Sequence, residues 1–192
     1  MIYLASASPR RQELLQQLGI AFEAMPSNIL EVQERGESPE TYVRRVAADK
    51  ARFVENLIRE RSLPSHPVLG ADTEVVLDGE ILGKPRDRDH GIEMLQRLAG
   101  HTHEVLSAIC LVHAGKEHAA LSRSRVTLAP LTPVEIGQYW ETGEPVGKAG
   151  AYAIQGKAAA FISRLEGSYS GVMGLPLREL SEIMKKIGAG GL

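Results

Sequence analysis

Residues 4–13 read Leu4-Ala5-Ser6-Ala7-Ser8-Pro9-Arg10-Arg11-Gln12-Glu13, and they join an expected strand to an expected helix. The apolar run that ends at Ala5 predicts the strand. Ser8 is a good N-cap residue and Pro9 suits the first helical position, so the helix should begin there. Strand-like and helix-like segments alternate in the same way along the rest of the chain. This alternation predicts an α/β fold.

The start of this helix also suits an anion. Unpaired N–H groups and the partial positive charge of a helix N-terminus attract negative ligands. Arg10 and Arg11 add two guanidinium groups at that end. The alternative is an ordinary solvated helix start with two surface arginines. Residues 4–13 alone are compatible with both interpretations.

Length and composition favour one domain over residues 1–192, because 43% hydrophobic residues supply a full core. The formal net charge of −2 argues against a broad nucleic-acid surface and favours a small ligand. Cys110 is the only cysteine, which excludes an intrachain disulfide and a cysteine-based zinc site. The chain has neither an apolar run of membrane-spanning length nor a signal peptide, so we expect a cytoplasmic protein without membrane contact.

A second helix should open at Ser38 and Pro39, and its apolar stripe contains a lysine, Lys50. A lysine in such a stripe either extends to the edge of the core or points into a cleft where an anion neutralises it. The position of Lys50 within the stripe favours the cleft.

The run Val68-Leu69-Gly70-Ala71 predicts a buried strand, and Asp72 follows it directly. A carboxylate beside a buried strand needs hydrogen-bond donors, a cation or a metal ion to remain charged. Asp72 is therefore a candidate functional residue; the alternative is an aspartate that caps a turn. Asp78-Gly79 predicts a tight hairpin turn, after which Lys84 lies on an exposed corner.

The second half of the chain continues the alternation. Asp87 and the capping box that starts at Thr132 predict two helices. Gln155 follows an apolar segment, residues 151–154, that is interpreted as a strand, although Gln155 equally suits a turn. The remaining predicted elements are strands over 103–112 and 122–128 and a helix over 177–187.

Common motifs are absent. Residues 79–85 differ from a phosphate loop, because the segment is one residue short and has Pro85 where a magnesium-binding hydroxyl belongs. The chain lacks the glycine fingerprint of dinucleotide enzymes, the paired-histidine zinc helix and the nucleophile turn of serine hydrolases. These enzyme classes therefore lose support.

Five ordered motifs together resemble the Maf nucleotide pyrophosphatase family. The resemblance runs from Leu4 to Leu180, nearly the whole chain. The motifs are residues 6–15 (SASPRRQELL), 47–51 (AADKA), 70–73 (GADT), 83–85 (GKP) and 150–156 (GAYAIQG).

The resemblance implies an enzyme that cleaves a nucleoside triphosphate between its α- and β-phosphates, with a divalent metal cation (Mg, Mn or Co) as cofactor. It assigns proton acceptance to Asp72 and metal binding to Glu31 and Asp72. The phosphate-binding residues that it implies are Ser8, Arg10, Arg11, Lys50 and Lys84.

Within the family, Arg10, Thr73 and Gln155 match the branch that acts on dTTP and UTP, and the alternative is the branch that prefers 7-methyl-GTP. An amide such as that of Gln155 can donate to a pyrimidine carbonyl and accept from the ring N–H. The chain departs from the usual family pattern at Leu30, Ser107 and Glu74. Glu74 shares a face with Asp72 if the strand is regular, and it would then join the metal site.

The resemblance also implies a fold: an extended mixed sheet flanked by helices, with two lobes around a central cleft, in the style of inosine triphosphate pyrophosphatase. Such proteins are commonly dimeric. Two other functions stay open at this point. One is a nucleotide-binding regulator of cell division without essential catalysis, since the family is linked to inhibition of septum formation. The other is a nucleic-acid binder, which the net charge and the 5% aromatic content disfavour.

Overall fold

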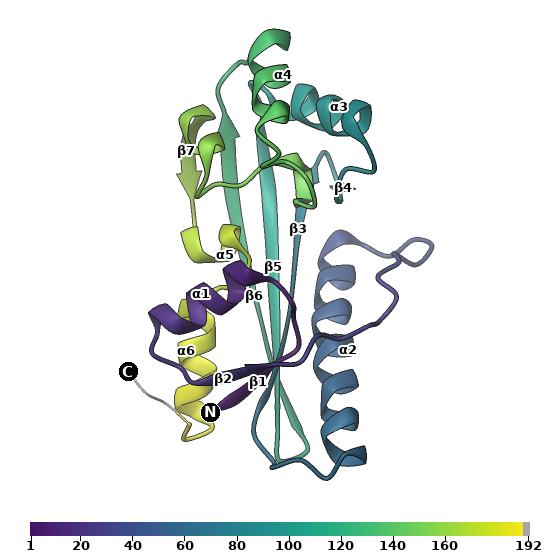
Figure 1. Ribbon diagram of the computed structural model, residues 1–192, viewed down its shortest axis with the longest axis vertical. Coiled ribbons are helices and arrows are strands. Elements are labelled where there is room, and N and C mark those ends of the chain that lie inside the picture. Colours follow the sequence, from purple (N-terminus) through teal and green to yellow (C-terminus); the bar gives the residue numbers. More distant parts are fainter. Residues whose placement is uncertain (190–192) are drawn as a thin grey trace.

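The computed structural model describes residues 1–189 and is built around one mixed β-sheet (Figure 1). Within those residues the strands are β1 (Ile2–Leu4), β2 (Phe22–Ala24), β3 (Val68–Leu77), β4 (Glu80–Leu82), β5 (Thr102–His113), β6 (Lys116–Leu128) and β7 (Ile162–Glu166). Their order is β2-β1-β3-β5-β6-β7, with β4 also paired to β3. β1 is parallel to β2 and β3, and the other pairs are antiparallel. The predicted mixed α/β fold is confirmed.

Helices cover both faces of this sheet. They are α1 (Pro9–Gln17), α2 (Pro39–Glu60), α3 (Arg88–Leu98), α4 (Pro133–Glu141), α5 (Tyr169–Met173) and α6 (Leu177–Lys186), with two 3₁₀ turns, η1 (Ala149–Ala151) and η2 (Lys157–Phe161). Within residues 1–189, no helix combines the length and the apolar character needed to cross a membrane.

The long strands β3, β5 and β6 run through two lobes (Figure 1). In the lower lobe, successive residues of β3 point to opposite faces, so Leu69 packs with α1 and α6 while Val68 packs with α2. In the upper lobe, Val75 and Val105 pack under α3 and α4. Each lobe therefore has its own apolar core on a shared sheet.

The edge of β3 is open between the two lobes. β1 pairs with β3 only at Val68 and Leu69, and β4 pairs with it only over residues 75–77. Residues 70–74 are hydrogen-bonded to β5 on one side, and no described strand covers their other side. Asp72 lies at the middle of this open segment, within a continuous strand. The alternative of a turn-capping aspartate is therefore wrong.

Helix α2 approaches β3 very closely at Gly70. A Cβ atom on Gly70 would lie 2.1 Å from the carbonyl oxygen of Ala47, so only glycine permits this contact. Lys50 lies within one helical turn of Ala47 and is buried on the same side of α2. The contact at Gly70 thus brings Lys50 to Asp72.

Residues 151–154 do not form the predicted strand. Gly150 and Ala151 have φ values of +64° and +57°, which is left-handed backbone, and the segment forms η1 followed by a turn. The Gly150 N–H donates to the Gly83 carbonyl in place of a strand partner. Four buried apolar residues satisfy a packed turn as well as a strand, so the hydrophobic pattern was ambiguous. Gln155 therefore lies in a turn.

Most other predicted elements are confirmed. Ser38 and Asp87 cap α2 and α3, and Thr132 forms the predicted capping box of α4. Asp78 and Gly79 have φ values of +50° and +81°, as a two-residue hairpin turn requires. The strand predicted over 122–128 begins earlier, at Lys116, and neither β7 nor α5 was predicted.

The contact between α2 and β3 predicts the effect of replacing Gly70. In Gly70→Ala the new methyl group must displace α2, so unfolding should become easier by about 1–3 kcal/mol. Gly137→Ala is the matched control, because Gly137 lies in α4 with nothing within 4 Å of an added Cβ atom. Urea unfolding measures both. An unaltered midpoint in Gly70→Ala would contradict the close contact.

Candidate active site

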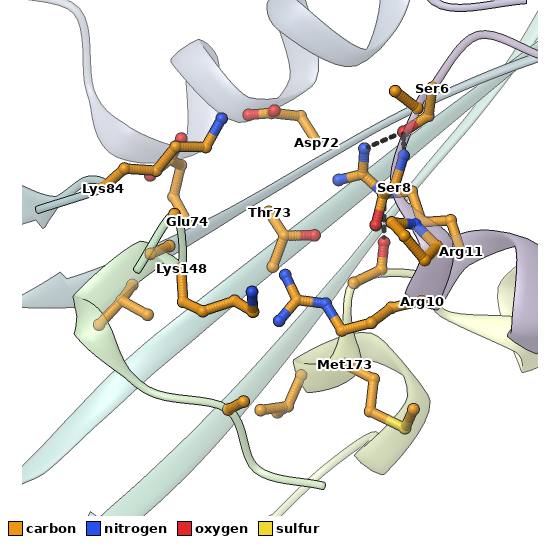
Figure 2. Close-up of a pocket in the computed structure, with 18 of the residues that line it drawn as sticks. Ser6, Ser8, Arg10, Arg11, Asp72, Thr73, Glu74, Lys84, Lys148 and Met173 are labelled. Carbon is orange, nitrogen blue, oxygen red and sulfur yellow. Dashed lines mark hydrogen bonds between the residues drawn. The ribbon is translucent and has the colours of Figure 1, made fainter. Parts of the chain in front are cut away.

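A cleft of about 750 Å³ lies where the edge of β3 is open (Figure 2). Its walls come from both lobes and from segments far apart in the sequence. The structure brings all of the residues expected from the sequence into this cleft, namely Ser8, Arg10, Arg11, Glu31, Lys50, Asp72, Thr73, Lys84 and Gln155.

A buried lysine and two carboxylates form the centre of the cleft. The Lys50 Nζ lies 2.8 Å from Oδ1 of Asp72 and 2.9 Å from Oε2 of Glu31. The side chains of Lys50 and Asp72 are 8% and 5% exposed, and that of Glu31 is 36% exposed. Oδ2 of Asp72 is buried without a hydrogen-bond partner. Lys50 thus holds Asp72 by one oxygen and leaves the other available.

Glu74 is a second buried carboxyl on the same face of β3. It is 9% exposed, and its Oε2 also lacks a hydrogen-bond partner. Burial, with a further contribution from the charge of Asp72, raises the pKa of Glu74 from 4.5 to about 8. Figure 2 shows Lys84 extending over Glu74 toward Asp72. The surrounding protein therefore disfavours the charged form of Glu74 and leaves one of its oxygens without a hydrogen bond.

Arg11 has a fixed orientation. Its Nε donates to the Gly174 carbonyl at 2.9 Å, and its Nη1 donates to Oγ of Ser6 at 3.1 Å. Burial lowers the pKa of Arg11, while the charges of Asp72 and Glu31 oppose that shift. Because a guanidinium has five N–H donors, Arg11 keeps further donors for a ligand.

Sequence reasoning missed a cation in the cleft, Lys148. Figure 2 shows the Lys148 ammonium and the Arg10 guanidinium pointing toward one another. Burial, followed by the charge of Arg10, lowers the pKa of Lys148. Two cations held close together indicate a place for an anion. The sequence held a signal for this residue, because Lys148 lies two residues before the motif that begins at Gly150.

Ser8 is the N-cap residue of α1, but its side chain makes no capping hydrogen bond, so capping explains only its backbone conformation.

Thr73 faces the other side of β3 from Asp72 and shares a 2.8 Å hydrogen bond with the hydroxyl of Ser107. The turn with Gln155 is anchored by Glu144, which accepts from the N–H groups of Lys157 and Ala158.

Histidines are not part of this cleft. Nε2 of the buried His103 is 2.8 Å from the Tyr152 hydroxyl, and burial lowers the pKa of His103 to about 4. Within residues 1–189, no three Asp, Glu, His or Cys side chains are grouped so that they could hold a metal ion.

Comparison with known proteins gives the family. The family description "Maf-like protein" matches residues 1–187. The chain belongs to the Maf family. The five motifs of this Maf protein line one cleft, which agrees with the resemblance found in its sequence.

Similar proteins match nearly the whole length of this Maf chain. One from Alkalilimnicola ehrlichii is 53% identical over 95% of this chain and 91% of its own length. One from Xanthomonas campestris is 52% identical over 98% of this chain and 100% of its own length, and one from Cupriavidus pinatubonensis is 50% identical over 96% of each. All three are named dTTP/UTP pyrophosphatase.

The raised pKa of Glu74 predicts a pH-dependent stability. Between pH 4.5 and about 8, folding in metal-free buffer keeps a proton on Glu74 that the unfolded chain has released. The contribution of Glu74 to the free energy of unfolding is therefore fully present at low pH. It is lost as the pH rises through about 8. Glu74→Gln lacks the group, so it should gain stability relative to the wild type across this window.

Thermal unfolding with EDTA at several pH values measures this difference. Glu23→Gln, an exposed substitution on β2, serves as the control and should follow the wild type. Parallel profiles for the wild type and Glu74→Gln would show that the folded state does not disfavour the Glu74 carboxylate.

Proposed function

We propose that this Maf protein hydrolyses dTTP and UTP to the nucleoside monophosphate and pyrophosphate. One observation carries the proposal: cationic side chains converge on the buried carboxylate of Asp72 in one cleft. These side chains come from α1, from α2, from the segment after β4 and from the segment just before η1. The relatives named dTTP/UTP pyrophosphatase, at 50–53% identity over nearly the full chain, support the same activity.

The cations are suited to a triphosphate. Arg11 offers N–H donors from a guanidinium that Ser6 and Gly174 already orient, so little side-chain freedom is lost on binding. Arg10 and Lys148 lie together at one side of the cleft, and Lys84 lies near Asp72 (Figure 2). The N–H groups at the start of α1 and the hydroxyl of Ser8 add uncharged donors. Neutralising the phosphates lowers the barrier to attack by water.

Asp72 is the proposed proton acceptor. Lys50 donates to Oδ1, which places a cation beside the carboxyl group and fixes its orientation. Oδ2 is buried and unpartnered, so it can accept a proton from a water molecule placed between Asp72 and the α-phosphate. Release of pyrophosphate follows as the bond from the α-phosphorus to the bridging oxygen breaks.

A divalent cation is proposed as cofactor, and the orphaned Oδ2 of Asp72 fits one. When bound, the cation supplies positive charge at the phosphates and helps a water molecule lose its proton. The resemblance pairs Asp72 with Glu31 for this task. Lys50, however, already bridges one oxygen of each of these two carboxylates.

The choice of base is proposed to depend on Gln155, with Thr73 and Arg10 shaping the site. The amide of Gln155 presents one donor and one acceptor to the edge of a pyrimidine. The turn that carries it is held by Glu144, so its position is set by the protein and not by the ligand. We expect these residues to favour dTTP and UTP over 7-methyl-GTP.

We further propose that the substrate is a free nucleotide in the cytoplasm and that nucleic acid is not bound. The net charge of −2 supports this, because five basic residues line the cleft while most other arginines pair with surface acids. A homodimer stays a prediction of the family resemblance.

A product assay tests the proposed function. UTP, dTTP, CTP, ATP, GTP and 7-methyl-GTP are each incubated with magnesium, manganese or cobalt, and monophosphate and pyrophosphate are measured. Equal amounts of both products from UTP and dTTP are expected. Release of orthophosphate, preference for 7-methyl-GTP, or binding without turnover would each contradict the proposal, and the last result would favour a nucleotide-binding regulator.

Asp72→Asn should lower kcat by roughly a hundredfold or more, since a general base contributes at least that much. Nucleotide binding, measured by calorimetry, should remain. Asp49→Asn is the control, because Asp49 lies on α2 but pairs with Arg45 and Arg52. Wild-type turnover in Asp72→Asn would remove Asp72 from the mechanism.

Arg11→Lys keeps the charge and removes the guanidinium fork. Lysine cannot contact Ser6, Gly174 and a phosphate at once, so kcat/KM for dTTP should fall at least about tenfold. Arg44→Lys, where the exposed arginine pairs with Glu40, should leave kcat/KM unchanged. Wild-type kinetics in Arg11→Lys would exclude a direct role of the fork.

A further inference from the structure

Two buried carboxylate oxygens in the cleft have no partner. They are Oδ2 of Asp72 and Oε2 of Glu74, and both residues are at least nine-tenths buried. An unpartnered buried carboxylate oxygen is costly, because the water it loses on burial is not replaced by another donor. The cleft therefore contains two buried carboxyl oxygens that a ligand could contact.

The two oxygens belong to one face of one strand. Asp72 and Glu74 are two residues apart on β3, whose pairing with β5 is regular through both positions. Residues two apart in a strand point to the same face, so the two carboxyl groups are neighbours. Both residues line the cleft, which lies where no described strand pairs with the edge of β3 beside residues 70–74.

Glu31 is arranged differently. Its Oε2 lies 2.9 Å from the Lys50 Nζ, and its side chain is 36% exposed. Lys50 thus stands between Glu31 and Asp72, where a shared cation would have to displace a buried ammonium group. Within residues 1–189, Oε2 of Glu74 has no hydrogen-bond partner, although Figure 2 shows Lys84 extending over Glu74.

We propose that Asp72 and Glu74 together hold the divalent cation of this protein, and that Glu31 instead positions Lys50. This assignment rests on the proposed function for the presence of a cation. It makes Glu74 a metal ligand of this chain.

Ligand chemistry supports the pair. Magnesium and manganese prefer carboxylate oxygens, and magnesium is commonly bound by one or two carboxylates with substrate phosphates completing the coordination. Two carboxylates without a third ligating side chain agree with the absence of any larger group within residues 1–189. A carboxylate has about four lone-pair sites, so Asp72 can contact Lys50, a cation and a water molecule at the same time.

Titration with Mn²⁺ in the absence of nucleotide tests this assignment, with free Mn²⁺ followed by electron paramagnetic resonance. Glu74→Gln should raise the Kd for Mn²⁺ at least about tenfold, as Asp72→Asn should, because loss of a group that supports a metal costs that much or more. Glu31→Gln should keep the wild-type Kd. Glu23→Gln, on exposed β2, controls for loss of one negative charge.

Folding of the variants is checked separately. Glu74→Val replaces the carboxyl by an apolar group and should unfold in EDTA at no lower temperature than the wild type, yet it should gain no thermal stability from Mn²⁺. A rise in unfolding temperature with Mn²⁺ for Glu74→Val equal to that of the wild type would overturn the proposal.

Three results of the titration would also overturn it: an unaltered Kd in Glu74→Gln, a loss in Glu31→Gln as large as in Glu74→Gln, or no Mn²⁺ binding to the wild type at millimolar concentration. The titration is independent of turnover. Selective loss of Mn²⁺ binding in Glu74→Gln, in a protein that hydrolyses neither dTTP nor UTP, would uphold the metal site and reject the proposed function.

Discussion

The structure depends on a charged group in a place where strands are normally apolar: the carboxylate of Asp72 in the middle of β3. Such a group is stable only with a cation beside it, and the fold supplies Lys50. Lys50 reaches Asp72 because α2 packs directly on Gly70, and Asp72 lines a cleft because the pairing of β1 with β3 ends at Leu69. The local sequence, the helix packing and the interrupted sheet edge are therefore parts of one arrangement.

This arrangement divides the charges between the lobes. Arg11 and Lys50 come from the lobe of α1 and α2, whereas Lys84 and Lys148 come from segments beside the upper core. A polyphosphate in the cleft would contact both groups at once. The phosphate chain of a nucleotide is thus the kind of ligand that would reduce the repulsion among the cations of each lobe and connect the two lobes.

Local rules account for what the sequence predicted well. The caps at Ser38, Asp87 and Thr132 and the turn at Asp78 depend on neighbouring residues, and each is found in the structure. The place of Lys50 in an apolar stripe predicted a buried lysine at a cleft for the same reason. Family motifs then named the residues that line the cleft.

Other features depend on contacts between distant segments, and the sequence did not reveal them. The turn at residues 151–154 is set by a hydrogen bond from Gly150 to Gly83. The meeting of Lys148 with Arg10 and the bridge from Lys50 to Glu31 depend on how the segments fold over the sheet edge. Because β3, β5 and β6 pass unbroken between the lobes, a change in the width of the cleft requires these three hydrogen-bonded strands to bend. A nucleotide with a bulkier base would have to bend these three strands to enter the cleft.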